Sequence, residues 1–201
     1  MRTKRSLLPA TTAILGLAIL FAATTRLSRA QQDEEKARDN ILKVADSLSK
    51  SNASAAKQQA DALKGADLDD IMPLFSKRSA RNKKALGIGP TPGAIQPDGI
   101  EAKIEQLGRK QLSPSEVAAQ AAAIEQAAYV AAAIAMVVHD KCPVENKQGN
   151  KDPKDWVTWS EDMGKASMEL AAVAKARNAA GIQKAADRLD GVCKSCHVPF
   201  K

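Results

Sequence analysis

Apolar residues recur at helical spacing in the first part of the chain. Between residues 33 and 63 they fall three or four positions apart, which predicts amphipathic helix. The residues in this pattern are Ile41, Val44, Ala45, Leu48, Ala56, Ala60 and Leu63. Ser51 and Asn52 interrupt the pattern and predict a break between two helices.

The middle of the chain combines short helical stretches with a loop. A stretch from Leu68 to about Ala80 has helical spacing, although Pro73 disturbs its first turn. A second short helix is predicted over residues 100–110. The segment 86–99 between them cannot continue a helix, because it contains Gly87, Gly89, Pro90, Pro92, Gly93 and Pro97.

The second half of the chain carries clear helix starts. Ser113, Pro114 and Glu116 supply a cap residue, a proline at the first helical position and a glutamate three positions after the cap. The apolar stripe that follows runs to about His139. Asp152-Pro153 predicts the start of the next helix, and a last helix follows Arg177-Asn178. The faces expected inward are Trp156, Trp159, Met163, Ala166, Leu170 and Val173, then Ile182, Ala185, Ala186, Leu189, Val192, Cys193 and Cys196.

These elements predict an all-α fold. No stretch shows sustained strand alternation, and four principal antiparallel helices would close into a four-helix bundle. The earlier segments would then be extra N-terminal helices, within a single helical domain at 31–201 that includes the Gly/Pro-rich loop at 86–99.

The N-terminus has the pattern of a secretory signal peptide at residues 1–30. Basic residues precede an apolar run from Leu7 to about Ala23, and Ser28-Arg29-Ala30 is a small-x-small cleavage pattern. The alternative is a membrane anchor, which requires about 20 unbroken apolar residues. Pro9 and Gly16 interrupt this run, so cleavage after Ala30 is favoured and no membrane association is expected afterwards.

Charge and composition argue against a nucleic-acid partner and favour a large apolar cofactor. The segment 1–30 carries five basic residues and no acidic one, so the formal net charge of +7 falls to +2 for the remaining chain. No basic tract rich in aromatic residues remains, and nucleic acid is not an expected partner. Aromatic residues are only 3% of the chain, so a large apolar cofactor would supply bulk that the Ala-rich core lacks.

The chemistry of the chain is concentrated near its C-terminus. The residues Cys193-Lys194-Ser195-Cys196-His197 form the C-x-x-C-H motif that attaches c-type haem. Two thiols about one helical turn apart meet the two vinyl groups on one edge of the porphyrin, and His197 is then held under the iron. We expect one covalent haem c, bound by Cys193 and Cys196.

Two other interpretations use the same cysteines. A redox disulfide between Cys193 and Cys196 is typical of a βαβ setting, which this helical sequence lacks. A zinc site could combine them with His139 and Cys142. Zinc would leave His197 unused, so haem is the favoured cofactor.

The end of the chain resembles the cytochrome c-prime family, the class II c-type cytochromes. The resemblance covers about the last 50 residues, from Asp155-Trp156-Val157-Thr158-Trp159 through the segment 193–201, to a lesser extent the helix at 113–140, and little of the region 33–111. Phe200 and Lys201 match the aromatic and the basic residue that follow the motif in that family. The resemblance implies a four-helix bundle with haem among the helices, electron transfer or binding of gases such as nitric oxide, and a homodimer. Pro199 departs from the family pattern, and we expect the helix to end before it.

The residue opposite His197 decides between these functions. A methionine ligand would give a six-coordinate electron-transfer centre, and an apolar residue would leave iron open to gas. Met72 is the candidate distal ligand, because low-spin relatives use a methionine from the first helix. We expect Met136 and Met163 to be packing residues. His139 is expected to be a solvated helix end, and Cys142 to be a buried free thiol or an intermolecular disulfide.

The sequence therefore predicts an exported mono-haem cytochrome of the periplasm that is not an enzyme. Its partner would be a redox protein, or a small gas if the iron is five-coordinate. A zinc-stabilised helical module is the third hypothesis.

Overall fold

The structure is a computed structural model that describes residues 35–79, 82 and 84–200. The predicted signal peptide at 1–30 and Lys201 lie outside the described residues. Helices account for every regular element in the described part of the chain, which confirms the all-α fold class. Residues 35–49 are helical, followed by α2 (Ala53–Asp61), α3 (Leu68–Ile71), η1 (Met72–Phe75), α4 (Ile100–Arg109), α5 (Pro114–Val138), α6 (Pro153–Lys175) and α7 (Ala179–Phe200).

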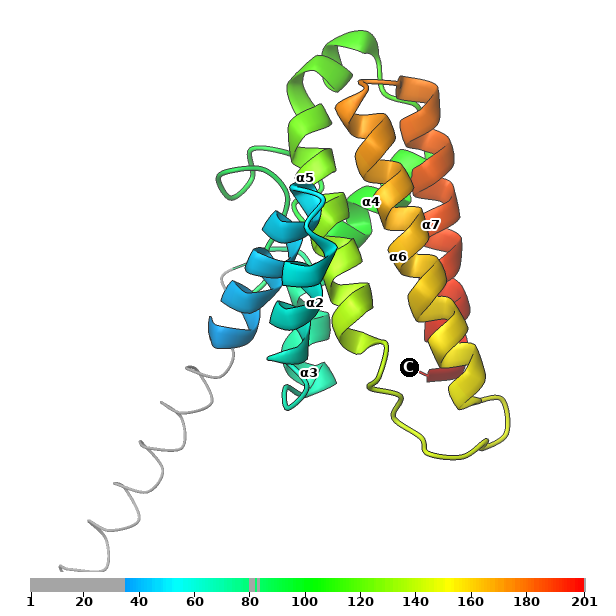
Figure 1. Cartoon of the computed structure of the whole chain (residues 1–201). Coiled ribbons are helices and arrows are strands. Elements are labelled where there is room, and N and C mark those ends of the chain that lie inside the picture. Colours follow the sequence, from blue (N-terminus) through cyan, green and yellow to red (C-terminus); the bar gives the residue numbers. More distant parts are fainter. Residues whose placement is uncertain (1–34, 80–81, 83, 201) are drawn as a thin grey trace, which may run out of the picture.

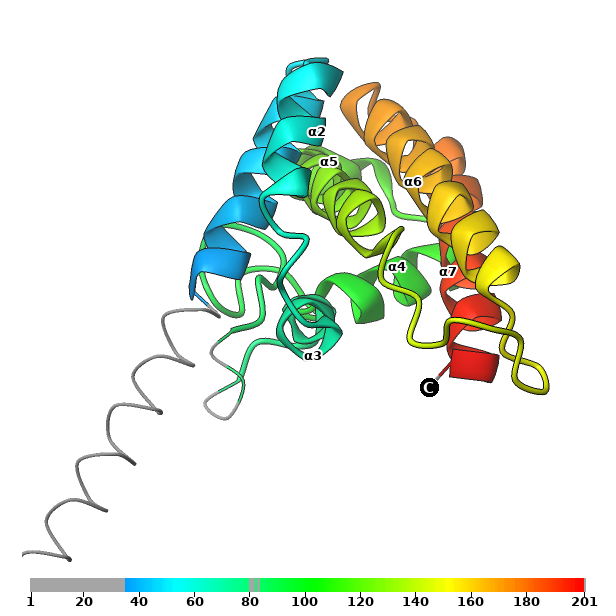
Figure 2. The same cartoon turned by 60° about the horizontal axis from the view of Figure 1, so that its bottom comes forward.

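The long helices α5, α6 and α7 form the centre of the bundle. Figure 1 shows them side by side, with α4 packed against α7. The helix at 35–49 and α2 cover the other side of α5, as Figure 2 makes clear. The fold is therefore a helical bundle with additional N-terminal helices, as the sequence predicts.

Local capping signals determine where the long helices begin. The hydroxyl of Ser113 accepts a hydrogen bond from the Glu116 amide at 3.3 Å, and the Glu116 carboxylate accepts one from the Ser113 amide at 2.7 Å. This capping box starts α5. The Asp152 carboxylate accepts from the Lys154 amide at 2.9 Å and caps the start of α6. Both starts confirm the sequence predictions.

The helix α5 is apolar on almost all sides. By length and composition it is the one described helix that could cross a membrane. Most of it is buried between the N-terminal helices and α6, which is what the central helix of a bundle requires.

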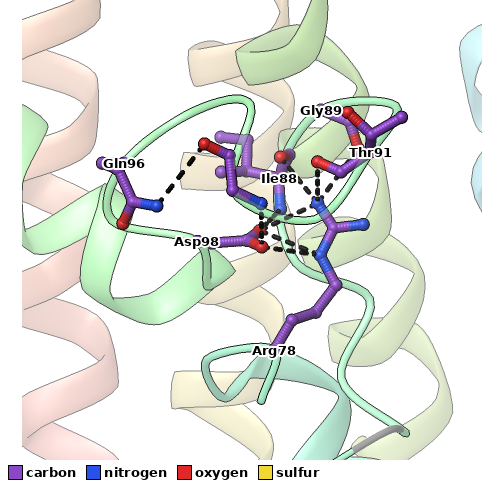
Figure 3. Close-up of polar contacts among 7 residues, drawn as sticks. Arg78, Ile88, Gly89, Thr91, Gln96 and Asp98 are labelled. Atoms are coloured by element: carbon purple, nitrogen blue, oxygen red, sulfur yellow. Dashed lines mark hydrogen bonds and ion pairs between the residues drawn. The ribbon is translucent and has the colours of Figure 1, made fainter. Parts of the chain in front are cut away.

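The Gly/Pro-rich loop at 86–99 is irregular, as predicted, and an ion pair organises it. Figure 3 shows Arg78 and Asp98 facing each other inside the loop. The Arg78 Nε lies 2.9 and 3.0 Å from the two Asp98 carboxylate oxygens, and the Arg78 Nη2 donates to the carbonyls of Ile88, Gly89 and Thr91. The same carboxylate accepts from the amides of Ile88 and Gly93. The backbone of the loop thus makes its polar contacts with the ion pair between Arg78 and Asp98.

The electrostatics of the loop favour an ionised Asp98. Burial of Asp98 opposes ionisation, but the hydrogen bonds from Arg78, Ile88 and Gly93 outweigh it and hold the pKa of the carboxyl below its usual value. Gly87 has φ +61°, and a Cβ there would lie 1.9 Å from the Arg78 Nε. The ion pair therefore requires glycine at this position.

Two of the expected helix boundaries are wrong. The stretch predicted from Leu68 to about Ala80 is a single turn of α-helix followed by the 3-10 turn η1, because Pro73 lacks the amide that a longer helix would use. The helix α7 is longer than predicted, because it does not stop before Pro199 but continues to Phe200. Phe200 packs against α6, which holds this last turn in place.

Candidate haem-binding site

The three residues of the predicted haem motif lie together near the end of α7. Cys193 and Cys196 are three positions apart in continuous helix, so their side chains lie on one side of it, one turn apart. Both thiols are free, both residues are half-buried, and both pack against the hydrophobic core. His197 follows directly and is also half-buried. The helix thus places two thiols and an imidazole at one end of the bundle.

Aromatic residues anchor this end of α7 to α6. The ring of Phe200 meets Trp156 edge-on, with centroids 5.1 Å apart, and Trp159 in the same manner at 6.2 Å. The Trp156 indole N–H in turn donates to the carbonyl of Val138 at 2.8 Å, which ties α6 to the end of α5. The motif therefore lies in a part of α7 that aromatic contacts hold against α6.

Acidic side chains approach the motif from α4 and from α7 itself. The Glu101 carboxylate of α4 lies 3.8 Å from the Nδ1 of His197. On α7, Asp190 pairs with Lys194 at 2.5 Å. The sequence around Glu101 does not indicate this contact, because only the packing of α4 against α7 brings Glu101 to His197.

The thiols of the motif are held in their neutral form. Burial, followed by the nearby charges of Glu101 and Asp190, raises the pKa of Cys193 to about 12. Burial also raises the pKa of Cys196 to about 11, with a smaller contribution from Cys142. The apolar surroundings therefore disfavour the thiolate form of both cysteines.

The predicted zinc alternative finds no support in this geometry. Across residues 35–79, 82 and 84–200, no three His, Cys, Asp or Glu side chains are placed to hold a metal ion. His139 lies at the end of α5, where its Nδ1 is 2.5 Å from the Asp140 carboxylate. His139 is the C-cap of α5 and its side chain is 36% exposed, as expected of a solvated helix end. Cys142 is a half-buried free thiol.

The structure places Met72 in η1, outside the two helices that pack extensively on α7. It is half-buried and packs against the hydrophobic core. The helices with extensive packing on α7 are α4 and α6. Met72 as the distal ligand therefore stays a prediction. Met136 and Met163 are half-buried against the core, as expected of packing residues.

These residues fit a covalently bound haem. The donor set of a c-type haem is two thiols one helical turn apart and an adjacent imidazole, and α7 presents these groups. Both cysteines pack against the hydrophobic core, and the contact between Trp156 and Phe200 lies at the same end of α7. Cys193 and Cys196 would hold the porphyrin edge and His197 would ligate iron. An all-α bundle with this donor set on its last helix defines a c-type cytochrome of the bundle class.

Comparison with known families agrees. The family model for cytochrome C′ matches residues 99–201, slightly more than half of the 201-residue chain. The chain belongs to the cytochrome c′ family and is a c-type haem protein. The matched region contains α4 to α7 and the whole motif. No curated protein and no solved structure gives a significant match to the chain.

Proposed function

We propose that this protein is an exported electron carrier that works in the periplasm with one covalently attached haem. The observation that carries the proposal is the placement of Cys193, Cys196 and His197 on one end of α7, within the region that matches the family. When bound, haem supplies a one-electron centre that cycles between ferric and ferrous iron.

The protein's own residues would hold and shelter this centre. Two thioethers and the adjacent imidazole attach the cofactor at three points of one rigid helix, so it would be held in one orientation and would not dissociate. Phe200 packs against Trp156 at the end of that helix and covers part of its surface. We favour a carrier over an enzyme because a covalently held one-electron centre in a small domain can transfer electrons without a further catalytic group.

Export is part of the proposal. The signal-peptide pattern at residues 1–30 agrees with a family whose proteins are generally exported. The partners would be redox proteins of the same compartment.

Gas binding at a five-coordinate iron is the second candidate function. It is favoured by α4, which packs on α7, because this helix contains neither methionine nor histidine. Its buried positions include Ile100, Ile104 and Leu107. An apolar face of this kind would leave the sixth position of iron open to a small neutral ligand.

Optical spectroscopy of the haem-loaded protein separates the two functions. For an electron carrier with a methionine ligand we expect a low-spin reduced spectrum that carbon monoxide does not change. The Met72→Leu variant should then become high-spin and bind carbon monoxide. A wild-type reduced spectrum that is high-spin and shifts at once with carbon monoxide or nitric oxide would reject the carrier and establish the gas-binding function.

A further inference from the structure

The proposed iron ligand has one acidic neighbour across a helix interface. Glu101 lies in the first turn of α4, and its Oε1 is 3.8 Å from the Nδ1 of His197. This is the one ion pair that Glu101 makes with a described residue. The Glu101 side chain is 50% exposed and the His197 side chain is 32% exposed. Both side chains therefore have room to shift by the small distance that separates this 3.8 Å contact from a hydrogen bond.

Close backbone packing fixes the position of α4 relative to α7. A Cβ added to Gly108 would lie 2.9 Å from the Cα of Asp187, so the two helices approach closely at this end. The Gln183 side chain also donates to the Gly108 carbonyl at 3.4 Å. Glu101 stands two turns earlier on α4 and therefore reaches α7 near its C-terminal end, beside His197.

The contact distinguishes the two nitrogens of the imidazole. Because Nδ1 faces the carboxylate, Nε2 is the nitrogen that remains for iron. Histidines that bind metals commonly donate their other ring N–H to a carboxylate or carbonyl, which fixes the tautomer and the ring orientation and raises the basicity of the ligand.

We propose that Glu101 is a positioning residue for His197, with its carboxylate accepting the Nδ1–H of the haem-ligating imidazole. The inference rests on the proposed haem attachment and adds a regulating group to it. A more basic imidazole and a nearby negative charge both stabilise ferric over ferrous iron, so Glu101 would lower the reduction potential of the centre.

Two other carboxylates of α4 and α7 pair with residues other than His197. Asp190 pairs with Lys194, and Glu105, one turn after Glu101 on α4, pairs with Arg109 at 2.5 Å. Glu105 therefore supplies a matched control: it has the same charge on the same helix but no ion pair with the imidazole.

The test is a redox titration of the haem-loaded protein and three variants. We expect Glu101→Gln, which keeps the shape and removes the charge, to raise the midpoint potential. Glu101→Asp should restore part of the wild-type value, and Glu105→Gln should shift the potential much less than Glu101→Gln. Because Glu101 is exposed, far-ultraviolet circular dichroism should be the same for all four proteins.

Two results would overturn the inference: an unchanged potential in Glu101→Gln, or equal shifts in Glu101→Gln and Glu105→Gln. Equal shifts would mean that any negative charge on α4 changes the midpoint potential by the same amount, whether or not it contacts His197. Failure of the underlying haem attachment looks different, because wild-type protein would then carry no covalent haem and show no haem potential at all.

Discussion

Replacing Asp98 with asparagine should strongly destabilise the protein, because it leaves the Arg78 guanidinium without its counter-charge. The Asp98 side chain is 9% exposed and that of Arg78 17%, so water screens the pair only weakly. Removing one partner of a buried ion pair costs about 3–5 kcal/mol. The amides of Ile88 and Gly93 would also lose a charged acceptor.

We expect the stability loss in Asp98→Asn to lie near the lower end of this range of about 3–5 kcal/mol. The Arg78 Nη2 keeps three carbonyl acceptors in the variant, which compensate the guanidinium in part. We therefore expect a loss of about 3 kcal/mol in the free energy of unfolding, which corresponds to roughly 10 °C in Tm for a domain of this size.

Urea unfolding followed by circular dichroism measures this change. The control is Asp69→Asn, because Asp69 is an exposed carboxylate on α3 and its replacement should change stability by less than about 0.5 kcal/mol. A loss in Asp98→Asn no larger than in the control would refute the conclusion that this ion pair organises the loop.

The same carboxyl predicts a pH dependence. The pKa of Asp98 is lower in the folded protein than its usual value of about 3.9, so its contribution is complete above that value and is lost as the pH falls through the folded pKa. Wild-type stability should decline in acid below about pH 4, and Asp98→Asn should flatten this decline. An equally steep decline in the variant would show that other carboxyls are responsible.

Four further substitutions test local features of the bundle and the haem ligand. Ser113→Ala removes the cap of α5 and should cost about 1 kcal/mol in urea unfolding; no loss would reject the capping box as a stabilising feature. Trp156→Phe leaves the Val138 carbonyl without its indole donor and should also cost about 1 kcal/mol, whereas Trp159→Phe should cost less. His197→Ala should retain both thioethers by mass and lose the native optical spectrum; an unchanged spectrum would reject His197 as the ligand.

Short-range signals explain why much of the fold could be predicted from the sequence. The starts of α5 and α6 depend on residues within three positions of each other, such as Ser113 with Glu116. The motif at the end of α7 is equally local. The local effect of Pro199 predicts that the last helix stops before it, and this prediction is wrong because Phe200 packs against Trp156 on another helix.

Long-range contacts could not be predicted in this way. The dense glycines and prolines at 86–99 predict a loop, but not that Arg78 and Asp98 meet within it. Glu101 meets His197 only because α4 packs against α7, and nothing in the residues around Glu101 indicates this. The motif was therefore visible in the sequence, whereas the groups that surround it required the fold.

Mass spectrometry of the exported, mature protein tests the central claim most directly. Digestion should yield a peptide containing residues 193–197 with one haem bound through both cysteines. Cys193→Ser and Cys196→Ser should each lose one thioether, and Cys142→Ser should retain both, because only the first two belong to the motif. Colourless wild-type protein, with the three cysteines unmodified and no covalent tetrapyrrole, would contradict the account.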